Sequence, residues 1–123
     1  MKIRPASYQE VVARFGPVVG NKVSFLPSAE HWVAEVKDTV VGCCAIWRRG
    51  QSTWILKSLW VDPPYRRQGI GRAMFDYRCS ILRSRGVRLA RGNFTKYSLP
   101  LALGHGGKVI AVNGYSSTVE FAP

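Results

Sequence analysis

Acidic residues are scarce in this 123-residue chain. Only 7 Asp and Glu occur beside 18 Lys and Arg, which gives a formal net charge of +11 at pH 7. Acids so few and so widely spread cannot easily build an anionic pocket, so the sequence argues against polycationic ligands. The positive excess instead predicts an anionic partner, and nucleic acid, a phosphorylated cofactor and an acidic protein all satisfy that prediction.

Cysteine and histidine are also rare, with 3 Cys and 2 His. An odd number of cysteines, two of them adjacent at Cys43 and Cys44 in an apolar run, disfavours a disulfide framework. The chain has no C-x-x-C pair or Cys/His cluster, and His31 is far from His105 in the sequence, so we expect no metal site. No histidine is near the cysteine pair, which therefore predicts buried small apolar side chains rather than a nucleophile.

Long apolar runs are missing as well. The longest, residues 40–47 interrupted by Gly42, is too short to cross a bilayer, and residues 1–10 lack the apolar centre of a signal peptide. We therefore expect a soluble protein of a reducing compartment, the cytoplasm, without membrane contact. The length and the 46% of apolar residues predict one domain over residues 1–123 with a substantial core.

Positive charge is concentrated in the middle of the chain. Between Arg48 and Arg91 there are 11 basic residues and 2 acids, a net charge of +9 in 44 residues. We therefore expect the anion-binding site on this segment.

The N-terminal part predicts one strand and one helix. Residues 3–5 have the pattern of a short strand, and Ser7 is placed to cap a helix. Glu10 occupies the third helical position and would complete a capping box. Gly16-Pro17 should end this helix, and residues 18–27 should form a loop or a remnant helical turn.

The next segment predicts three antiparallel strands. Side chains alternate between apolar and polar over residues 32–37, and a second run over residues 40–48 follows a short polar break, which is typical of a hairpin. Residues 53–61 are apolar on both faces, as expected of a central strand. Pro63 and Pro64 should end that strand because neither has a backbone N–H to donate.

The second half predicts a longer helix that ends near Arg85. A period of 3.6 gives this helix one apolar face, formed by Ile70, Ala73, Met74, Tyr77 and Ile81. The elements expected after it are a strand over residues 87–93, a helix over 99–105 capped by Ser98, and a hairpin over 108–121. Antiparallel strands followed by a strand–helix–strand crossover predict an α/β fold, an α+β mixed sheet with helices on both faces.

A basic loop over residues 66–71 joins the central strand to the longer helix. Its two glycines allow the backbone to approach a ligand closely. The first amides of a helix have no internal acceptors, and the helix dipole adds positive potential, so a pyrophosphate can bind there. The loop lacks the Lys-Ser/Thr pair of the Walker loop and the third glycine of the dinucleotide fingerprint, which excludes both of those phosphate sites.

The segment from Leu59 to Phe75 carries the pattern R-x-x-G-x-G after an extended V-x-P segment, and the hairpin AEVKDTVVGCCAI precedes it. It resembles the acetyl-CoA-binding signature of the GNAT acetyltransferase superfamily over residues 32–89. The short chain resembles compact, divergent members such as those of bacteriophages. The resemblance implies a GNAT-like fold, whose mostly antiparallel sheet has one splayed parallel strand pair, and acetyl-CoA as co-substrate.

The resemblance also implies which residues contact the cofactor. The pyrophosphate would bind the loop residues Arg66, Arg67, Gln68, Gly69, Ile70, Gly71 and Arg72. The pantetheine arm would pair with the backbones of Leu59, Trp60 and Val61. Asn93 is a further candidate for contact with the arm, although asparagine also suits a strand end.

Many family members use a tyrosine in the short helix after the fifth strand to protonate the leaving thiolate. That position falls on Ala102 here, so the expected acid is missing. Tyr97 and His105 are the nearest replacements and are the candidate catalytic residues. Glu35 suits either a base acting through water or a solvent-facing strand position, and Glu10 suits a cap.

The expected function is transfer of an acetyl group from acetyl-CoA to an amine of a protein, a peptide or a small molecule. One clear helix before Trp32, where the family commonly has two, predicts an open acceptor groove. The charge favours an acidic protein or a neutral small amine. Two alternatives stay open: an inactive CoA-binding or interaction module, and a nucleic-acid-binding protein. The second rests on charge alone, since Trp54 and Trp60 have the spacing of core residues.

Overall fold

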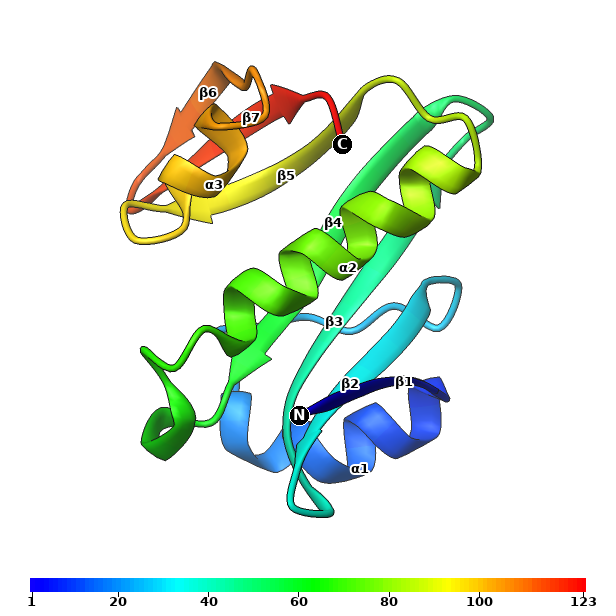
Figure 1. Ribbon diagram of the computed structural model, residues 1–123, viewed down its shortest axis with the longest axis vertical. Helices are drawn as coiled ribbons and strands as arrows, with labels where there is room; N and C mark the ends of the chain where they lie inside the picture. The colour runs from blue at the N-terminus through cyan, green and yellow to red at the C-terminus, as the bar shows by residue number, and fades with distance from the viewer.

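Seven strands form one mixed sheet in the order β1-β2-β3-β4-β5-β7-β6 (Figure 1). The computed structural model describes all residues 1–123. The strands are β1 (Lys2–Ala6), β2 (Glu30–Val36), β3 (Thr39–Arg49), β4 (Thr53–Val61), β5 (Ala90–Thr95), β6 (Lys108–Asn113) and β7 (Ser116–Phe121). All neighbouring strands are antiparallel except β4 and β5.

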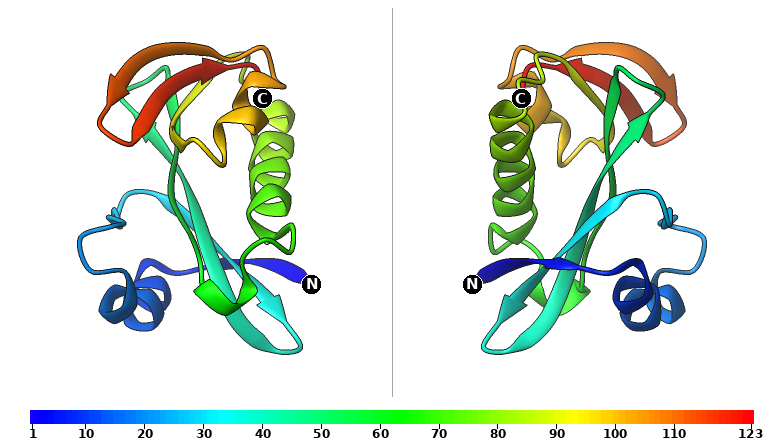
Figure 2. Two further views of the ribbon diagram at one scale, coloured as in Figure 1. Left: turned by 90° about the vertical axis from the view of Figure 1, so that its left-hand side faces the viewer. Right: turned by 90° about the vertical axis from the view of Figure 1, so that its right-hand side faces the viewer.

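Helices cover both faces of this sheet (Figure 2). They are α1 (Tyr8–Val19), α2 (Ile70–Ser84) and α3 (Leu99–Leu103). Figure 2 shows α2 and α3 on one side and α1 on the other. The predicted mixed α/β sheet with helices on both faces is confirmed.

The β2–β3 hairpin separates two hydrophobic cores. Trp32, Ala34 and Cys44 point into a core of 16 buried residues beneath α2 and α3, whereas Val33 and Cys43 join a core of 5 beneath α1. Successive strand residues point to opposite faces, so the adjacent cysteines belong to different cores. All three cysteines are buried and free, and burial of the Cys43–Cys44 pair is as predicted.

Helix α1 is longer than predicted. Ser7 is the N-cap, as predicted, and its Oγ accepts a hydrogen bond from the Glu10 amide at 3.0 Å. The expected stop at Gly16-Pro17 is wrong, because the helix continues to Val19. Val19 is buried in the smaller core, and this packing holds the last turn despite the proline.

The buried face of α2 is rotated from the predicted one. Ile70 and Met74 are buried as predicted, but Phe75, Cys79 and Leu82 complete the buried stripe. Ala73, Tyr77 and Ile81 are only partly buried. The rotation follows from β5 and β7, which bring Phe94 and Phe121 against the Phe75 ring at centroid distances of 6.0 and 5.6 Å.

The C-terminal elements follow the prediction closely. The strand predicted over residues 87–93 is β5, which begins later, at Ala90, because the Val87 amide still donates to Leu82 O at the end of α2. The hairpin predicted over residues 108–121 is β6 and β7, and β6 is the exposed edge of the sheet.

Arg78 is buried within α2, only 2% exposed. Its Nε donates to Met74 O at 3.2 Å, and its Nη1 donates to Ala45 O in β3 at 3.2 Å and to Lys57 O in β4 at 3.4 Å. No carboxylate pairs with it, so three backbone carbonyls solvate the charge. This guanidinium fastens α2 to two strands at one point.

Replacing Arg78 should therefore destabilise the fold. In Arg78→Met the carbonyls of Ala45 and Lys57 lose their donor, which should lower the free energy of unfolding by about 2 kcal/mol. Arg83→Met, at an exposed position of the same helix, should change it by less than ~0.5 kcal/mol. Urea unfolding followed by circular dichroism measures both variants, and equal losses would contradict the proposed role of Arg78.

Candidate functional site

Strand β4 is kinked in its second half. Ser58 has a φ of 59°, in the left-handed region, and the β3–β4 register shifts between Cys43 and Ala45. The Ser58 hydroxyl donates to Ser24 O at 2.6 Å, which fixes the kink to the loop before β2. The Arg78 guanidinium binds Lys57 O, one residue before Ser58. A left-handed serine is uncommon, and these contacts hold it in place.

Beyond this kink, β4 parts from β5. The two parallel strands pair only at Ile55 with Arg91 and at Leu56 with Gly92. The stretch Leu59–Val61 therefore has no partner on the β5 side, and β5 turns away from it (Figure 1). The three residues predicted to pair with a pantetheine arm thus border an open strand edge, which can accept an extended ligand as an added strand.

The chain turns sharply after β4. Asp62 precedes a short 3₁₀ turn over Pro63–Tyr65, and the two prolines end the strand as predicted. Helix α2 then starts at Ile70 with Gly69 as its N-cap. Gly69 has a φ of 82°, a conformation that glycine adopts without strain.

The amides at this turn are free. Six consecutive backbone N–H groups, from Arg67 to Arg72, donate to no acceptor in the protein, and the first helical bond is that of the Ala73 amide to Gly69 O. Such a row at a helix N-terminus suits an anion because the amide dipoles and the helix dipole point the same way. The loop predicted to bind pyrophosphate therefore has its donors available.

The three arginine side chains around this loop differ in how many contacts they make with the rest of the protein. Arg66 is held against β4, where its Nε donates to Val61 O at 2.8 Å and its guanidinium lies 4.6 Å from the centre of the Trp60 ring. Arg72 is exposed and only loosely paired with Asp76, at 3.9 Å. Arg67 is also exposed and has no acid partner. The loop therefore presents exposed positive charge beside its free amides.

The sequence of this region matches a known family. Residues 27–101 fit the family described as the acetyltransferase (GNAT) domain. The chain belongs to this GNAT acetyltransferase family. The matched residues include the kinked β4, the free amides and all of α2, so the features described above lie within the family's own domain.

Solved GNAT structures share the fold along their whole length. A Mycobacterium tuberculosis protein in complex with CoA is 18% identical with a TM-score of 0.77, covering 100% of this chain and 99% of that one. The PaiA N-acetyltransferase of Thermoplasma acidophilum, in complex with coenzyme A, is 12% identical with a TM-score of 0.71, covering 99% and 98%. A GNAT acetyltransferase of Elizabethkingia anophelis with acetyl-CoA bound is 14% identical with a TM-score of 0.69, covering 99% and 97%.

No curated protein sequence matches this chain. None of the helices combines the length and apolarity needed to span a bilayer. No group of three or more His, Cys, Asp or Glu side chains is placed to hold a metal ion.

The two predicted catalytic side chains lie in different surroundings. Tyr97 follows β5, is 76% exposed, and its hydroxyl makes no hydrogen bond within the protein. His105 lies just beyond α3, where its Nδ1 donates to Ala122 O at 3.0 Å and its ring packs 5.2 Å from that of Phe75. Ala102, at the position of the expected tyrosine, is fully buried.

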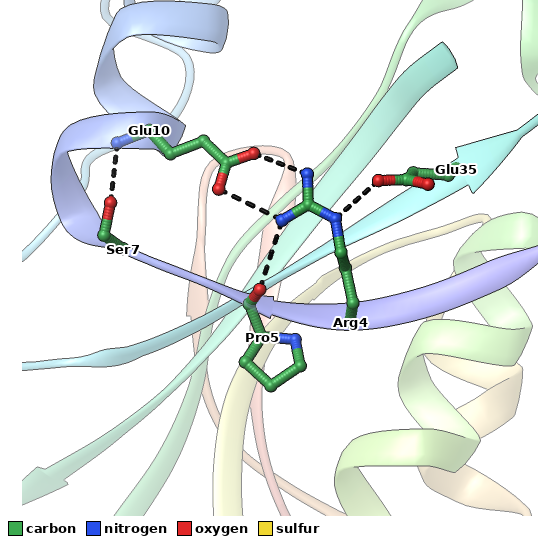
Figure 3. A network of polar contacts seen from close by, with 5 residues as sticks. All are labelled: Arg4, Pro5, Ser7, Glu10 and Glu35. Atoms are coloured by element: carbon green, nitrogen blue, oxygen red, sulfur yellow. Dashed lines mark hydrogen bonds and ion pairs between the residues drawn. The ribbon is translucent and has the colours of Figure 1, made fainter. Parts of the chain in front are cut away.

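Two acids considered above share one arginine (Figure 3). Arg4 binds Glu10 through Nη1 and Nη2 and Glu35 through Nε. Glu35 is thus neither solvent-facing nor free, and the Glu10 carboxylate turns to Arg4 rather than back to Ser7. Hydrogen bonding to Arg4 lowers the pKa of Glu10, which makes that carboxylate a weak base.

Asn93 takes part in the β5–β7 ladder. Its Oδ1 accepts a hydrogen bond from the Thr118 hydroxyl at 2.6 Å, and the residue is exposed. The side chain therefore has a structural partner on β7, while its amide nitrogen stays open to a ligand.

The sequence did not reveal Arg78 or Ser58. A polar residue on an amphipathic helix is ordinarily assigned to solvent, and nothing local marks Ser58 as left-handed. One signal was present: Arg78 follows the buried Met74 by four residues, so it lies on the same helix face.

The buried thiols should be unreactive in the folded protein. Burial raises the pKa of Cys43 to about 12 and that of Cys79 to about 11, and it also raises the pKa of Cys44. At pH 8 a chromogenic disulfide reagent should react at least about 100-fold more slowly with the native protein than with the urea-unfolded chain. One rapidly titrating thiol in the native state would contradict this burial.

Proposed function

We propose that this protein binds acetyl-CoA and transfers its acetyl group to an amine. The observation that carries the proposal is the row of six free amides at the start of α2, next to the strand edge that β5 leaves open. A pyrophosphate and an extended amide-bearing arm require these two features side by side. Neighbours of the same fold hold CoA or acetyl-CoA, which supports the assignment.

The cofactor contacts follow from this arrangement. The amides of residues 67–72 bind the pyrophosphate, and the side chains of Arg67 and Arg72 neutralise it. Arg66 holds the loop against β4 through its hydrogen bond to Val61 O. The backbone of Leu59–Val61 pairs with the pantetheine arm, and Asn93 on the facing strand offers its amide nitrogen to the same arm.

Transfer proceeds by direct attack in a ternary complex. The amine nitrogen forms a bond with the thioester carbonyl carbon, and the C–S bond breaks. The CoA thiolate takes a proton from Tyr97, while the nitrogen releases one to water, from which the tyrosine recovers its own. Tyr97 suits this role because it follows β5 at the splayed end and its hydroxyl is unoccupied. His105 is the second candidate, through Nε2, since Nδ1 is engaged.

The acceptor is an uncharged small amine or an amine on an acidic protein. Six of the seven acids already pair with arginines, and only Asp38 does not. No acidic pocket is left for a polycation. A single helix, α1, stands between β1 and β2, which leaves this side open for a protein segment. The free buried thiols support a cytoplasmic setting.

A second candidate function has one observation in its favour. Ala102 replaces the tyrosine expected of an active family member, so the chain suits an acyl-CoA-binding module without turnover. A thiol-release assay across amine and peptide panels separates the two. Acetyl-CoA binding without release on any acceptor would establish the module.

Gly71→Glu should weaken acetyl-CoA binding at least about tenfold, because it places a carboxylate against the pyrophosphate. A Cβ at Gly71 meets no atom within 4 Å, so the variant should fold. The glutamine of Gly71→Gln is nearly the same size as glutamate but carries no charge, so this variant should lose much less acetyl-CoA affinity. Calorimetric titration measures both variants, and equal affinities for wild type and Gly71→Glu would overturn the loop assignment.

Tyr97→Phe should lower kcat about 100-fold and leave the KM for acetyl-CoA unchanged, because it removes only the proton donor. His105→Gln, measured in parallel, should keep kcat within about threefold. A large loss of kcat in His105→Gln with little change in Tyr97→Phe would assign the general acid to His105. Unchanged kcat in both variants would show that water protonates the thiolate.

A further inference from the structure

A concave basic surface lies at the opposite end of α2 from the amide row. Its volume is about 490 Å³. Arg48 and Trp54 from the β3–β4 hairpin form one side, and Arg85, Arg88 and Leu89 from the segment between α2 and β5 form the other. The 15 residues of α2 separate it from the acetyl-CoA loop by about 22 Å, at about 1.5 Å per residue. We call it the distal pocket.

Positive charge dominates the distal pocket. Three arginines line it, Arg48, Arg85 and Arg88, and Glu30 pairs with Arg85. These three arginines and one glutamate leave a net charge of +2. No carboxylate pairs with Arg48 or Arg88; Arg48 donates through Nε and Nη2 to Gln51 O, while its Nη1 makes no hydrogen bond. Acetyl-CoA bound at the far end of α2 neutralises none of it.

The apolar part of the distal pocket is aliphatic. The guanidinium groups of Arg48 and Arg85 lie over the Trp54 ring, 5.3 and 5.7 Å from its centre. Leu89, by contrast, is 56% exposed, and Val87 beside it is partly exposed. A single-stranded nucleic acid binds by stacking bases on open aromatic faces, and the Trp54 ring is already covered by cations. Leu89 instead offers contact to an aliphatic side chain.

We propose that the distal pocket docks an acidic segment of a partner protein, with carboxylates on Arg48 and Arg88 and an apolar side chain on Leu89. Charge complementarity favours an anionic occupant, and the exposed Leu89 favours one that also carries an apolar side chain, as an acidic peptide does. The unpaired Arg88 guanidinium can match a carboxylate with two parallel hydrogen bonds, and Arg48, whose Nε and Nη2 are engaged by Gln51 O, offers its Nη1. The proposal does not depend on acetyl transfer, because the pocket shares no residue with the acetyl-CoA loop.

A fluorescent peptide, Glu-Glu-Leu-Leu-Glu-Glu, is the probe, and fluorescence polarisation at low salt reads its binding. The double variant Arg48→Gln/Arg88→Gln should bind it about tenfold more weakly than wild type. Lys22→Gln/Lys108→Gln removes the same two charges elsewhere and should stay within about twofold. Acetyl-CoA affinity should be unchanged in both double variants. Because Arg48 also contacts Gln51 O and the Trp54 ring, thermal unfolding is compared in the single variant Arg88→Gln, which breaks no hydrogen bond and should unfold like wild type. Weaker probe binding by Arg88→Gln with unchanged unfolding separates loss of docking from loss of fold or function.

Further arms test the apolar contact and the class of partner. Replacing both leucines of the probe by serine, or Leu89 by Ser, should weaken binding about threefold or more. Arg88→Glu alone, at a side chain with no contact to lose, should reproduce most of the double variant's effect. Absence of probe binding at millimolar concentration, or equal losses in the two double variants, would overturn the proposal. An oligothymidylate that binds more tightly than the peptide and is lost in the same variant would make the surface a nucleic-acid site instead.

Discussion

The Arg78 guanidinium joins α2 to β3 and β4 at the point where β4 loses its regular pairing. A buried charge is costly unless polar groups surround it, and here backbone carbonyls provide that solvation. Because these carbonyls belong to the two strands and the guanidinium to the helix, the position of α2 along β4 is set. The start of α2 is thereby held beside the end of β4, where the free amides and the open strand edge meet.

The elements that the sequence predicted best are those determined by local pattern. The β2–β3 hairpin, the prolines after β4, the glycine start of α2 and the terminal hairpin depend on side-chain alternation and turn residues a few positions apart. The motif at residues 66–71 identified the family for the same reason. The candidate pyrophosphate loop could therefore be located before its geometry was known.

What the sequence could not predict depends on contacts between distant segments. The end of α1 at Val19, the rotation of α2 toward Phe121 and the left-handed Ser58 are all held by partners from other elements. The strand pattern likewise does not show that Glu35 pairs with Arg4, which lies 31 residues earlier in the chain. In each case tertiary packing overrides the local preference on which the prediction was based.

The two register pairs between β4 and β5 also determine how the two halves of the sheet are joined. Strands β1 to β4 form one half of the sheet, and β5, β7 and β6 form the other, joined in the ladder only at Ile55 and Leu56. Elsewhere the two halves are joined by side chains, since the core beneath α2 includes Trp32 and Cys44 of one half and Phe94 and Phe121 of the other. The width of the gap between Val61 and the end of β5 is therefore set by side-chain packing and not by ladder hydrogen bonds.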